Sequence, residues 1–411
     1  MERVVVVGAS LAGQRAAHSL RGGGFDGEIV VLGDELHPPY TRPPLSKEIL
    51  VGSQLVSDCA LPLRDLEVDW RLGKRAGGLD RATKAILLDD GDAVGYDRLI
   101  AATGVRARPW PGPGGELRGV HTLRTLDDAA ALAAELSPGR HLVIVGAGFI
   151  GCEVAASARK LGVEVTMLAA DPHPLLPLGE MIGGWAEAMH RGQGVDVRCD
   201  CAVVALRGNE GAVTEVELGD GSSIPADAVL VAIGAVPNSE WLADSGLALD
   251  PGLICDETMT AAGDADVLVA GDLASFPHPH RPGSHRRIEH WTVAAELGAL
   301  AGRNALLEAG ERVPYAGLPY VWSDQYESKI QSIGSPGEAD RFEVLESTAD
   351  RGRFVVLGLL GERPVAVIAV NAAKRLNWYR RNFSQLDDRE TIGRLLAAED
   401  SVLGPPTEVM A

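Results

Sequence analysis

The feature that most constrains the fold is a strand, a glycine-rich turn, a helix and a second strand, which occur in this order twice along the 411 residues. In the first copy, the β-branched apolar run from Arg3 to Val7 leads into a turn at Gly8. The second copy has its turn at Gly146, 138 residues later. Apolar runs separated by helical spacing indicate βαβ units, whose two strands are parallel. The sequence therefore predicts an α/β protein with two such units.

The bounds of these elements follow from the apolar pattern and from good helix formers. The first unit is predicted to contain strands over residues 3–7 and 28–32 and a helix over 11–21; the second, strands over 141–145 and 163–168 and a helix over 149–161. Three further apolar segments end at a tight turn with glycine and are predicted to be buried strands. They span residues 99–104, 229–234 and 267–272.

Composition divides the chain into domains. Residues 109–115, PWPGPGG, are typical of a linker, and Pro237-Asn238 marks a second junction, so the second unit is predicted to be inserted into the first. From about Pro319 the pattern changes to short strands (329–333, 341–345, 353–359 and 364–370) and two helical stretches (372–381 and 389–397). We predict a first α/β domain over 1–112 and 239–317, an inserted second over 113–238, and an α+β domain over 318–411.

Charge and cysteine usage exclude several classes of protein. The formal net charge of −19 argues against nucleic-acid binding and against anionic membrane surfaces. The chain has neither an apolar run long enough to span a bilayer nor a signal-peptide pattern at its start, which predicts a cytoplasmic protein. Five cysteines without a CxxC predict neither a disulfide framework nor a metal site.

The first glycine turn is a dinucleotide fingerprint with one departure. It places Ser10 where the pattern has its second glycine, and a serine fits there if its φ is negative and its side chain points away. Two carboxylates follow Gly13 by 21 and 22 residues, where a ribose hydroxyl would be bound. The candidate residues here are Gly8, Ser10, Leu11, Ala12, Gly13, Asp34 and Glu35.

The second glycine turn is a complete fingerprint, with a diphosphate expected at the helix N-terminus. The candidate residues here are Gly146, Gly148, Phe149, Ile150 and Gly151, with Gly234 at the end of a later strand. The next strand ends in Leu168-Ala169-Ala170-Asp171, without a carboxylate at Ala169 and without an arginine or lysine for a 2′-phosphate. The pattern favours NADH, and NADPH remains an alternative.

Two dinucleotide turns in one chain, without a Ser-His-Asp pattern or a metal cluster, predict a flavin and a nicotinamide that share one active site. Hydride transfer is the simplest chemistry for this pair. We therefore predict two Rossmann-like dinucleotide-binding domains of the glutathione reductase type, with FAD and NAD(P)H as cofactors.

Five segments in order resemble the FAD-dependent, NADH-using ferredoxin reductases of bacterial oxygenase and cytochrome P450 electron-transfer chains, to which putidaredoxin reductase and apoptosis-inducing factor are related. The segments are Pro39 to Lys47, Gly146 to Glu153, Ala270-Gly271-Asp272, Glu289-His290-Trp291 and Trp322 to Tyr326. The resemblance extends over the whole chain. It implies a reductase that passes single electrons from FAD to a [2Fe–2S] ferredoxin, as a monomer or homodimer.

The resemblance also implies roles for particular residues. Arg42 would contact the FAD pyrophosphate, Lys47 the isoalloxazine, and Glu153, on the first turn of its helix, would pair with Lys47. Asp272 would accept a ribityl hydroxyl, and Trp291 and Trp322 would flank the flavin and nicotinamide. Lys47, Glu153 and Trp322 are the predicted catalytic residues, and further FAD contacts are predicted at Pro43, Thr103, Gly104, Gly271, Glu289 and His290.

Other functions remain as alternatives. The resemblance to apoptosis-inducing factor also permits a flavoprotein that binds NADH and acts as a redox sensor or signalling protein. Two dinucleotide folds also fit a flavin monooxygenase. A disulfide reductase would need a redox cysteine early in the chain, and residues 36–50 contain none. An acidic ferredoxin would require local basic clusters on this acidic chain, for which Arg286-Arg287, Lys374-Arg375 and Arg380-Arg381 are candidates.

Overall fold

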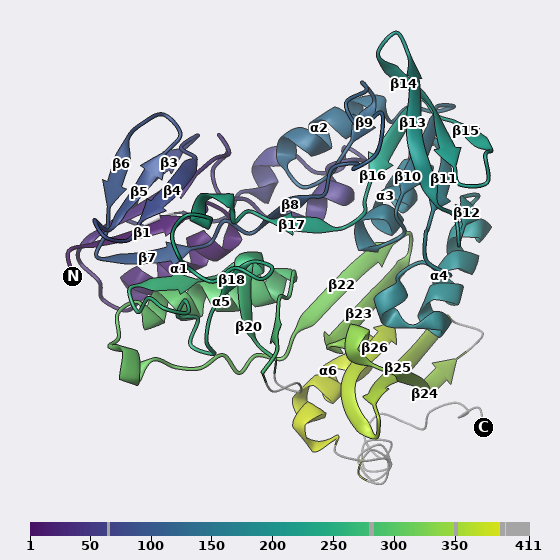
Figure 1. The fold of residues 1–411 in the computed structure, drawn as a ribbon. Coiled ribbons are helices and arrows are strands. Elements are labelled where there is room, and N and C mark those ends of the chain that lie inside the picture. The colour runs from purple at the N-terminus through teal and green to yellow at the C-terminus, as the bar shows by residue number, and fades with distance from the viewer. Residues whose placement is uncertain (64–65, 279–282, 349–351, 387–390, 392–411) are drawn as a thin grey trace. The chain divides into compact units, whose positions relative to one another are not determined.

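The computed structural model describes residues 1–63, 66–278, 283–348, 352–386 and 391 and divides into two compact units (Figure 1). Unit 1 comprises Met1–Pro43, Leu55–Arg106 and Ala235–Gly317, and unit 2 comprises Pro44–Gln54, Ala107–Gly234 and Leu318–Ala411. Apart from Thr391, the predicted helix over 389–397 lies outside the described residues, as does the C-terminal tail. Within the described ranges, none of the helices combines the length and the apolar character needed to cross a bilayer.

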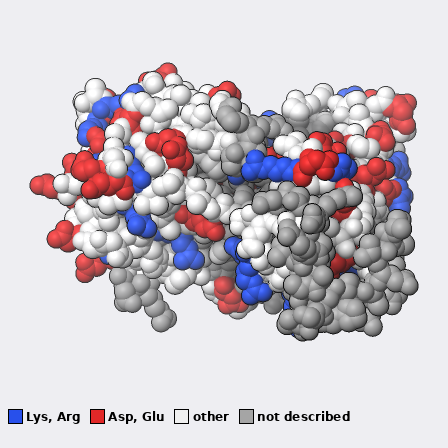
Figure 2. Space-filling view, turned by 90° about the horizontal axis from the view of Figure 1, so that it is seen from below, with Lys and Arg blue, Asp and Glu red and all other residues white. Residues whose placement is uncertain are grey.

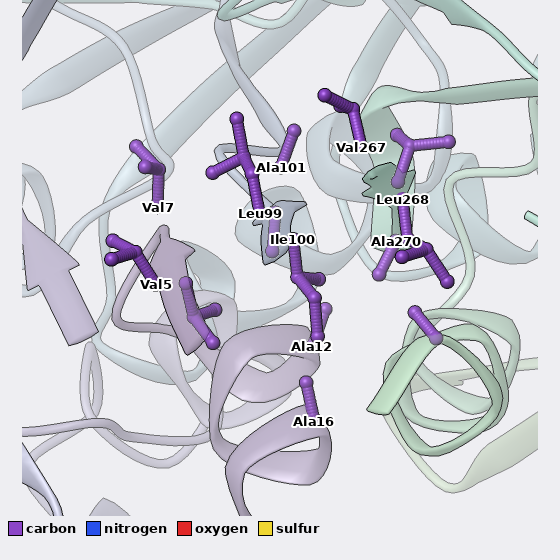
Figure 3. Packing of buried hydrophobic residues seen from close by; sticks show 14 of the residues in the cluster. Val5, Val7, Ala12, Ala16, Leu99, Ile100, Ala101, Val267, Leu268 and Ala270 are labelled. Carbon is purple, nitrogen blue, oxygen red and sulfur yellow. The ribbon is translucent and has the colours of Figure 1, made fainter. Parts of the chain in front are cut away.

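Unit 1 is built on a five-stranded parallel sheet with the order β19-β7-β1-β2-β3. Its strands are β1 (Arg3–Val7), β2 (Glu28–Gly33), β3 (Asp69–Leu72), β7 (Arg98–Ala101) and β19 (Val267–Val269). Helices α1 (Leu11–Gly22) and α5 (Trp291–Asn304) pack against each other and against this sheet. Small residues permit the close approach: a Cβ on Gly298 would lie 2.3 Å from the carbonyl oxygen of Ala12. Apolar side chains from these elements form the core in Figure 3.

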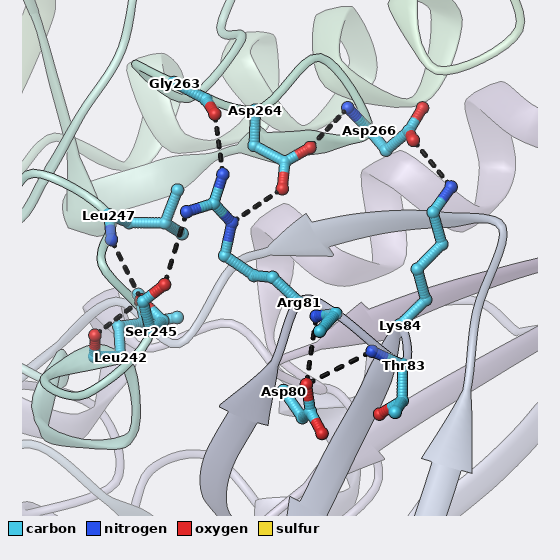
Figure 4. A network of polar contacts seen from close by, with 11 residues as sticks. Asp80, Arg81, Thr83, Lys84, Leu242, Ser245, Leu247, Gly263, Asp264 and Asp266 are labelled. Carbon is cyan, nitrogen blue, oxygen red and sulfur yellow. Dashed lines mark hydrogen bonds and ion pairs between the residues drawn. The ribbon is translucent and has the colours of Figure 1, made fainter.

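The remaining strands of unit 1 form smaller sheets. They are β4 (Ala76–Asp80), β5 (Ala85–Leu88), β6 (Ala93–Gly95), β8 (Val105–Ala107), β17 (Ala235–Pro237), β18 (Leu253–Ile254), β20 (Ala274–Pro277) and β21 (His285–Arg286). A polar network attaches the β4–β6 meander to the segment that precedes β19 (Figure 4). In it, Arg81 donates to the Asp264 carboxylate at 2.7 Å, and Lys84 pairs with Asp266 at 2.6 Å.

Unit 2 contains a second five-stranded parallel sheet, with the order β12-β11-β10-β16-β9. Its strands are β9 (Val120–His121), β10 (His141–Val145), β11 (Glu164–Leu168), β12 (Asp196–Arg198) and β16 (Ala228–Val231). The helices of this part are α2 (Leu126–Glu135), α3 (Phe149–Lys160) and α4 (Glu180–Gly192). A three-stranded antiparallel sheet adds β13 (Val203–Asn209), β14 (Ala212–Leu218) and β15 (Ser223–Pro225). The two parallel sheets confirm the predicted pair of Rossmann-like folds.

The C-terminal part of unit 2 is an antiparallel sheet with the order β22-β23-β26-β25-β24. Its strands are β22 (Tyr320–Gln325), β23 (Ser328–Gly334), β24 (Arg341–Thr348), β25 (Arg353–Leu360) and β26 (Arg363–Val370). Helix α6 (Ala373–Asn382) packs on the sheet through Leu376 and Tyr379, both buried. The predicted α+β character is confirmed, and β22 is a strand beyond the four that were predicted.

Candidate dinucleotide sites and a buried ion pair

The turn between β1 and α1 has the backbone geometry of a dinucleotide fingerprint. Gly8 has φ 121°, and a Cβ there would lie 2.1 Å from the carbonyl oxygen of Ala102. A Cβ on Gly13 would lie 1.9 Å from the carbonyl oxygen of Gly8. Ser10 has φ −114°, which any L residue adopts, so the serine meets the backbone condition for its position.

The turn between β10 and α3 repeats this geometry. Gly146 has φ 110°, and a Cβ there would lie 2.3 Å from the carbonyl oxygen of Ala232; Gly151 packs on Gly146 in the same way. Gly148 differs: its φ is −76° and a Cβ there would meet no described atom within 4 Å. Neither Ser10 nor Gly148 supplies a side-chain cap to the helix that follows. Both helix N-termini therefore present backbone N–H groups to an anion such as a diphosphate.

A carboxylate and a guanidinium lie beside the first turn. Arg42 donates to the Glu35 carboxylate at 2.6 Å and to the Tyr40 hydroxyl at 2.8 Å, and its guanidinium also lies 3.4 Å from the hydroxyl of Ser10. Although burial opposes it, electrostatic interactions with Tyr40 and with the Glu35 carboxylate raise the pKa of Arg42 above its usual value. The structure thus brings Ser10, Glu35 and Arg42 together, whereas the predicted Asp34 is exposed.

A second group of predicted residues in unit 1 follows β19. Gly271 has φ 68°, and its Cβ position is 2.9 Å from the Cβ of Ala12 in α1. Asp272 is buried, and its backbone carbonyl accepts a hydrogen bond from Arg287 at 2.9 Å. Arg287 also pairs with Glu289 at 2.8 Å. Arg287 is therefore engaged within unit 1, and the basic pair Arg286-Arg287 does not form a freely available docking cluster.

The segment before α5 holds a buried imidazole nitrogen. Nδ1 of His290 is buried and forms no hydrogen bond to any residue that the structure describes. Burial lowers the pKa of His290 to about 4, so its ring is neutral at pH 7. A buried polar atom without a protein partner is uncommon and fits a position that a bound ligand completes. The neighbouring indole of Trp291 donates to Thr41 at 3.0 Å.

The remaining predicted FAD contacts of unit 1 lie at two chain segments. Thr103 donates through its hydroxyl to the Asn238 carbonyl at 2.6 Å, and Asn238 returns a bond to the Thr103 carbonyl at 3.0 Å. Gly104 has φ 63° and an open Cβ position. Pro43 begins the short helix η1 (Pro43–Ser46), which leads to Lys47.

Unit 2 contains a buried ion pair between Lys47 and Glu153. The Nζ of Lys47 lies 2.7 Å from Oε2 of Glu153, and the two side chains are 13% and 6% exposed. The same carboxylate accepts hydrogen bonds from the hydroxyls of Ser46 and of Ser323, the latter at 2.7 Å. Glu153 is the fifth residue of α3, beyond the first turn where it was expected, and its carboxylate faces these donors rather than the helix N-terminus.

A row of polar side chains extends this pair. The Gln325 amide donates to the Ser323 hydroxyl at 3.1 Å, and its oxygen lies 3.1 Å from Nε2 of His190. Nδ1 of His190 lies 3.1 Å from the hydroxyl of Tyr326. No role is predicted for Ser323, Gln325, Tyr326 or His190 from the sequence. Alternation along a strand, which places Ser323 and Gln325 on one buried face, was the available signal.

The buried His190 gives a pH-dependent contribution to stability. Burial lowers its pKa from 6.5 to about 4, against the smaller raising effect of the Gln325 hydrogen bond. Below pH 6.5 the unfolded chain therefore binds a proton that the folded chain does not, and stability falls with pH. We expect a loss of about 2 kcal/mol between pH 7 and pH 5. Urea unfolding of the wild type and of His190→Gln at both pH values checks this; equal pH slopes would contradict it.

The other predicted residues of unit 2 lie within β22, at the start of α3 and in the connection that follows β16. The ring of Trp322 stacks on Tyr320 with centroids 5.8 Å apart and planes at 21°. Phe149 and Ile150 form the first turn of α3, where Ile150 is exposed. Gly234 has φ 94°, and its carbonyl accepts from the backbone N–H of Arg108 at 2.9 Å.

The five cysteines do not provide a redox pair. All five are thiols rather than disulfides, and Cys59, Cys152 and Cys255 are buried. Burial raises the pKa of Cys152, of Cys255 and of Cys201, and it raises the pKa of Cys199 to about 11. Since the thiolate is the reactive form, these thiols do not support disulfide-reductase chemistry at neutral pH.

Comparisons with known proteins place the chain in a family. Residues 2–298 match the model of the pyridine nucleotide-disulphide oxidoreductases, and residues 320–398 match the reductase C-terminal model. Rhodocoxin reductase of Rhodococcus erythropolis is 38% identical, with 90% of this chain and 86% of that protein aligned. The biphenyl dioxygenase system ferredoxin–NAD(+) reductase component of Paraburkholderia xenovorans (strain LB400) is 39% identical, covering 92% of each.

A solved structure shows the same relationship. The reductase in the crystal structure of the covalent putidaredoxin reductase–putidaredoxin complex superimposes with a TM-score of 0.88 at 31% identity, covering 97% of this chain and 98% of that one. The sequence and structure comparisons agree over nearly the whole length. The chain therefore belongs to the pyridine nucleotide-disulphide oxidoreductase family and, within it, to the ferredoxin reductases.

Proposed function

We propose that this reductase takes a hydride from NADH onto bound FAD and delivers the electrons singly to a [2Fe–2S] ferredoxin of a dioxygenase or cytochrome P450 system. The observation that carries the proposal is the pair of glycine turns, at Gly8 and Gly146, each between a parallel strand and a helix N-terminus. The names of the relatives support the acceptor, since one is a ferredoxin–NAD(+) reductase component and another is joined to putidaredoxin.

Unit 1 offers the residues that would hold FAD. The N–H groups of the turn after Gly8 and the Arg42 guanidinium suit the diphosphate, and Glu35 suits a ribose hydroxyl. Asp272 and the Nδ1 of His290, both buried, suit the rest of the molecule. When bound, FAD supplies the conversion between two-electron hydride acceptance and release of electrons one at a time.

Unit 2 offers the residues that would hold the nicotinamide dinucleotide. The helix after Gly148 would receive its diphosphate. NADH is favoured because the chain after β11 has no cation for a 2′-phosphate at residues 169–172, and the arginine on the adjacent strand, Arg198, pairs with Asp196 at 2.9 Å.

The Lys47–Glu153 pair would hold the reacting groups in place. Three donors, the Lys47 ammonium among them, fix the carboxylate, so the ammonium has a defined position in a buried site. A fixed charge of this kind orients a substrate without reorganising during the reaction. Half-buried Trp322 would shield the flavin and nicotinamide rings.

Anaerobic stopped-flow measurement of flavin bleaching tests the proposal. The purified protein is mixed in parallel with NADH and with NADPH, and the fully reduced protein is then mixed with a [2Fe–2S] ferredoxin. We expect faster bleaching with NADH, followed by single-electron reduction of the ferredoxin. Absence of bleaching with both nucleotides would overturn the proposal and favour a signalling flavoprotein.

Helix α6 carries the basic side chains proposed to meet the ferredoxin. Lys374 and Arg381 are exposed and seven residues apart, which puts them on one face, whereas Arg375 pairs with Glu346 at 2.9 Å. Over the face drawn in Figure 2, basic and acidic side chains are interspersed, so attraction depends on such local groups. Reversing both charges (Lys374→Glu with Arg381→Glu) is expected to raise the KM for an acidic ferredoxin about tenfold at low salt.

A small electron acceptor provides the control for this docking prediction. Ferricyanide reduction should be unchanged in the double variant, because that acceptor needs no protein surface. Arg207→Glu, at an exposed position on β13, reverses one charge elsewhere on the chain, which is half of the change in net charge that the double variant makes. An equal rise in KM for that variant would attribute the effect to net charge and contradict docking on α6.

A further inference from the structure

The row of polar side chains in unit 2 is continuous from a surface turn to the buried carboxylate. Its members, in order, are Tyr326, His190, Gln325, Ser323 and Glu153, with successive distances of 3.1, 3.1, 3.1 and 2.7 Å. The side chains of His190, Gln325 and Ser323 are fully buried. The hydrogen-bond partners that the structure gives to these three side chains all lie within the row, so each donor must match an acceptor there.

The charge on Glu153 fixes the direction of every bond in the row. An ionised carboxylate only accepts, so Ser323 donates its hydroxyl hydrogen to Oε1 and accepts from the Gln325 amide nitrogen. The amide oxygen then requires a proton on Nε2 of His190. Nδ1 of the neutral ring is left as the acceptor for the Tyr326 hydroxyl. All donors therefore point toward Glu153.

The other oxygen of Glu153 leaves no place for a proton. Oε2 receives donors from the Lys47 ammonium and from the Ser46 hydroxyl. A proton on Glu153 would consequently sit on Oε1. The Ser323 hydroxyl would then accept a hydrogen bond from Glu153 instead of donating one to it. The reversal would turn the Gln325 amide over and move the ring proton of His190 to Nδ1. The hydrogen bonds of the row can therefore all point toward Glu153 or all point away from it. A proton cannot pass along the row through Gln325 unless its amide turns over, so the row does not act as a simple proton wire.

The outer end of the row is held in an unusual backbone conformation. Tyr326 begins the connection between β22 and β23 with φ 53°, in the left-handed region that glycine and asparagine prefer. A tyrosine at this position places its hydroxyl on Nδ1 of His190, and the two rings meet edge to face with centroids 5.3 Å apart. The turn therefore presents a phenol to the ring at the cost of a less favoured φ.

We propose that His190, Gln325 and Ser323 are positioning residues, whose aligned donors hold the Glu153 carboxylate against Lys47. The charge at residue 153 accordingly decides which nitrogen of His190 carries the proton. The effect on flavin reduction rests on the proposed function, whereas the link between residue 153 and His190 does not.

The tautomer of His190 tests the link without turnover. It is read from 15N NMR of histidine-labelled holoprotein, with His190→Gln used to assign the signal. We expect the ring proton of His190 on Nε2 in the wild type and on Nδ1 in Glu153→Gln. In the variant, Lys47 and Ser46 both donate and therefore require the amide oxygen of the new side chain, so its NH2 group faces Ser323 and reverses the row. Adding Ser323→Ala should make the tautomer independent of residue 153. The same tautomer in the wild type and Glu153→Gln would overturn the proposal.

Flavin reduction tests the positioning role. Ser323→Ala is expected to slow reduction at saturating NADH about tenfold while the Kd for NADH stays unchanged, and Ser323→Thr should restore the rate. Ser332→Ala is the matched control, since that buried hydroxyl of β23 has no hydrogen-bond partner among the described residues. If Glu153→Gln slows reduction and Ser323→Ala does not, the positioning role fails. If Glu153→Gln itself has no effect, the proposed function of the ion pair fails, and the tautomer measurement still decides the link.

Discussion

Replacing Glu153 by glutamine is expected to slow the reduction of bound FAD by NADH about 100-fold. The substitution keeps the shape of the side chain and removes the charge that pairs with Lys47 at 2.7 Å. The ammonium is then left in a buried site without its counter-ion and no longer has one defined position. Stopped-flow bleaching at saturating NADH measures the rate, and the flavin absorbance of the purified variant measures FAD retention, which should be complete.

Two further variants make this result specific to the ion pair. Lys47→Met should give a loss of similar size, and the double variant should be little worse than either single one, because both remove the same interaction. Glu164→Gln, at an exposed glutamate on β11, should react at the wild-type rate. Wild-type bleaching by Glu153→Gln, or additive losses in the double variant, would contradict a joint role.

Strands and helices with strong local signals could be predicted closely. The strands β1 and β10 begin and end where the apolar runs indicated, and α1 and α3 differ from the predicted helices by one residue at their ends. In both units a β-branched run meets a glycine that must adopt positive φ, so the turn and the start of the helix are fixed locally. Less regular strands carry weaker signals, and β22, with Trp322 and Asp324 beside Ser323, was not predicted as a strand.

The candidate site could be predicted only where one short segment carries it. The glycine turns are of this kind. The hydrogen bonds to Glu153 come from Ser46 and Ser323, which lie 107 and 170 residues away in the chain, and His190 joins through Gln325 across another 135 residues. Serine, glutamine and histidine are unremarkable in isolation, and only the packing of α3, α4 and β22 brings them together. Sequence spacing contains no information on that packing, so their role had to come from the structure.

Substitutions at Gly146 and at Gly148 of the second turn are expected to affect different properties, folding stability in the first case and nucleotide binding in the second. In Gly146→Ala, the new Cβ would lie 2.3 Å from the Ala232 carbonyl oxygen at a residue with φ 110°, so the backbone must move. We expect a loss of about 3 kcal/mol in the free energy of unfolding of unit 2. Urea unfolding followed by tryptophan fluorescence measures this loss.

Gly148→Ala is the matched variant, two residues along the same turn. Its φ of −76° suits alanine, and the added Cβ meets no described atom within 4 Å, so the free energy of unfolding should not change. If this open space is where the diphosphate approaches the backbone, the methyl group should raise the KM for NADH about tenfold and leave ferredoxin reduction by the prereduced protein unaffected. An unchanged KM would remove the second turn from the NADH site. A large loss of stability would instead show that Gly148, like Gly146, serves packing.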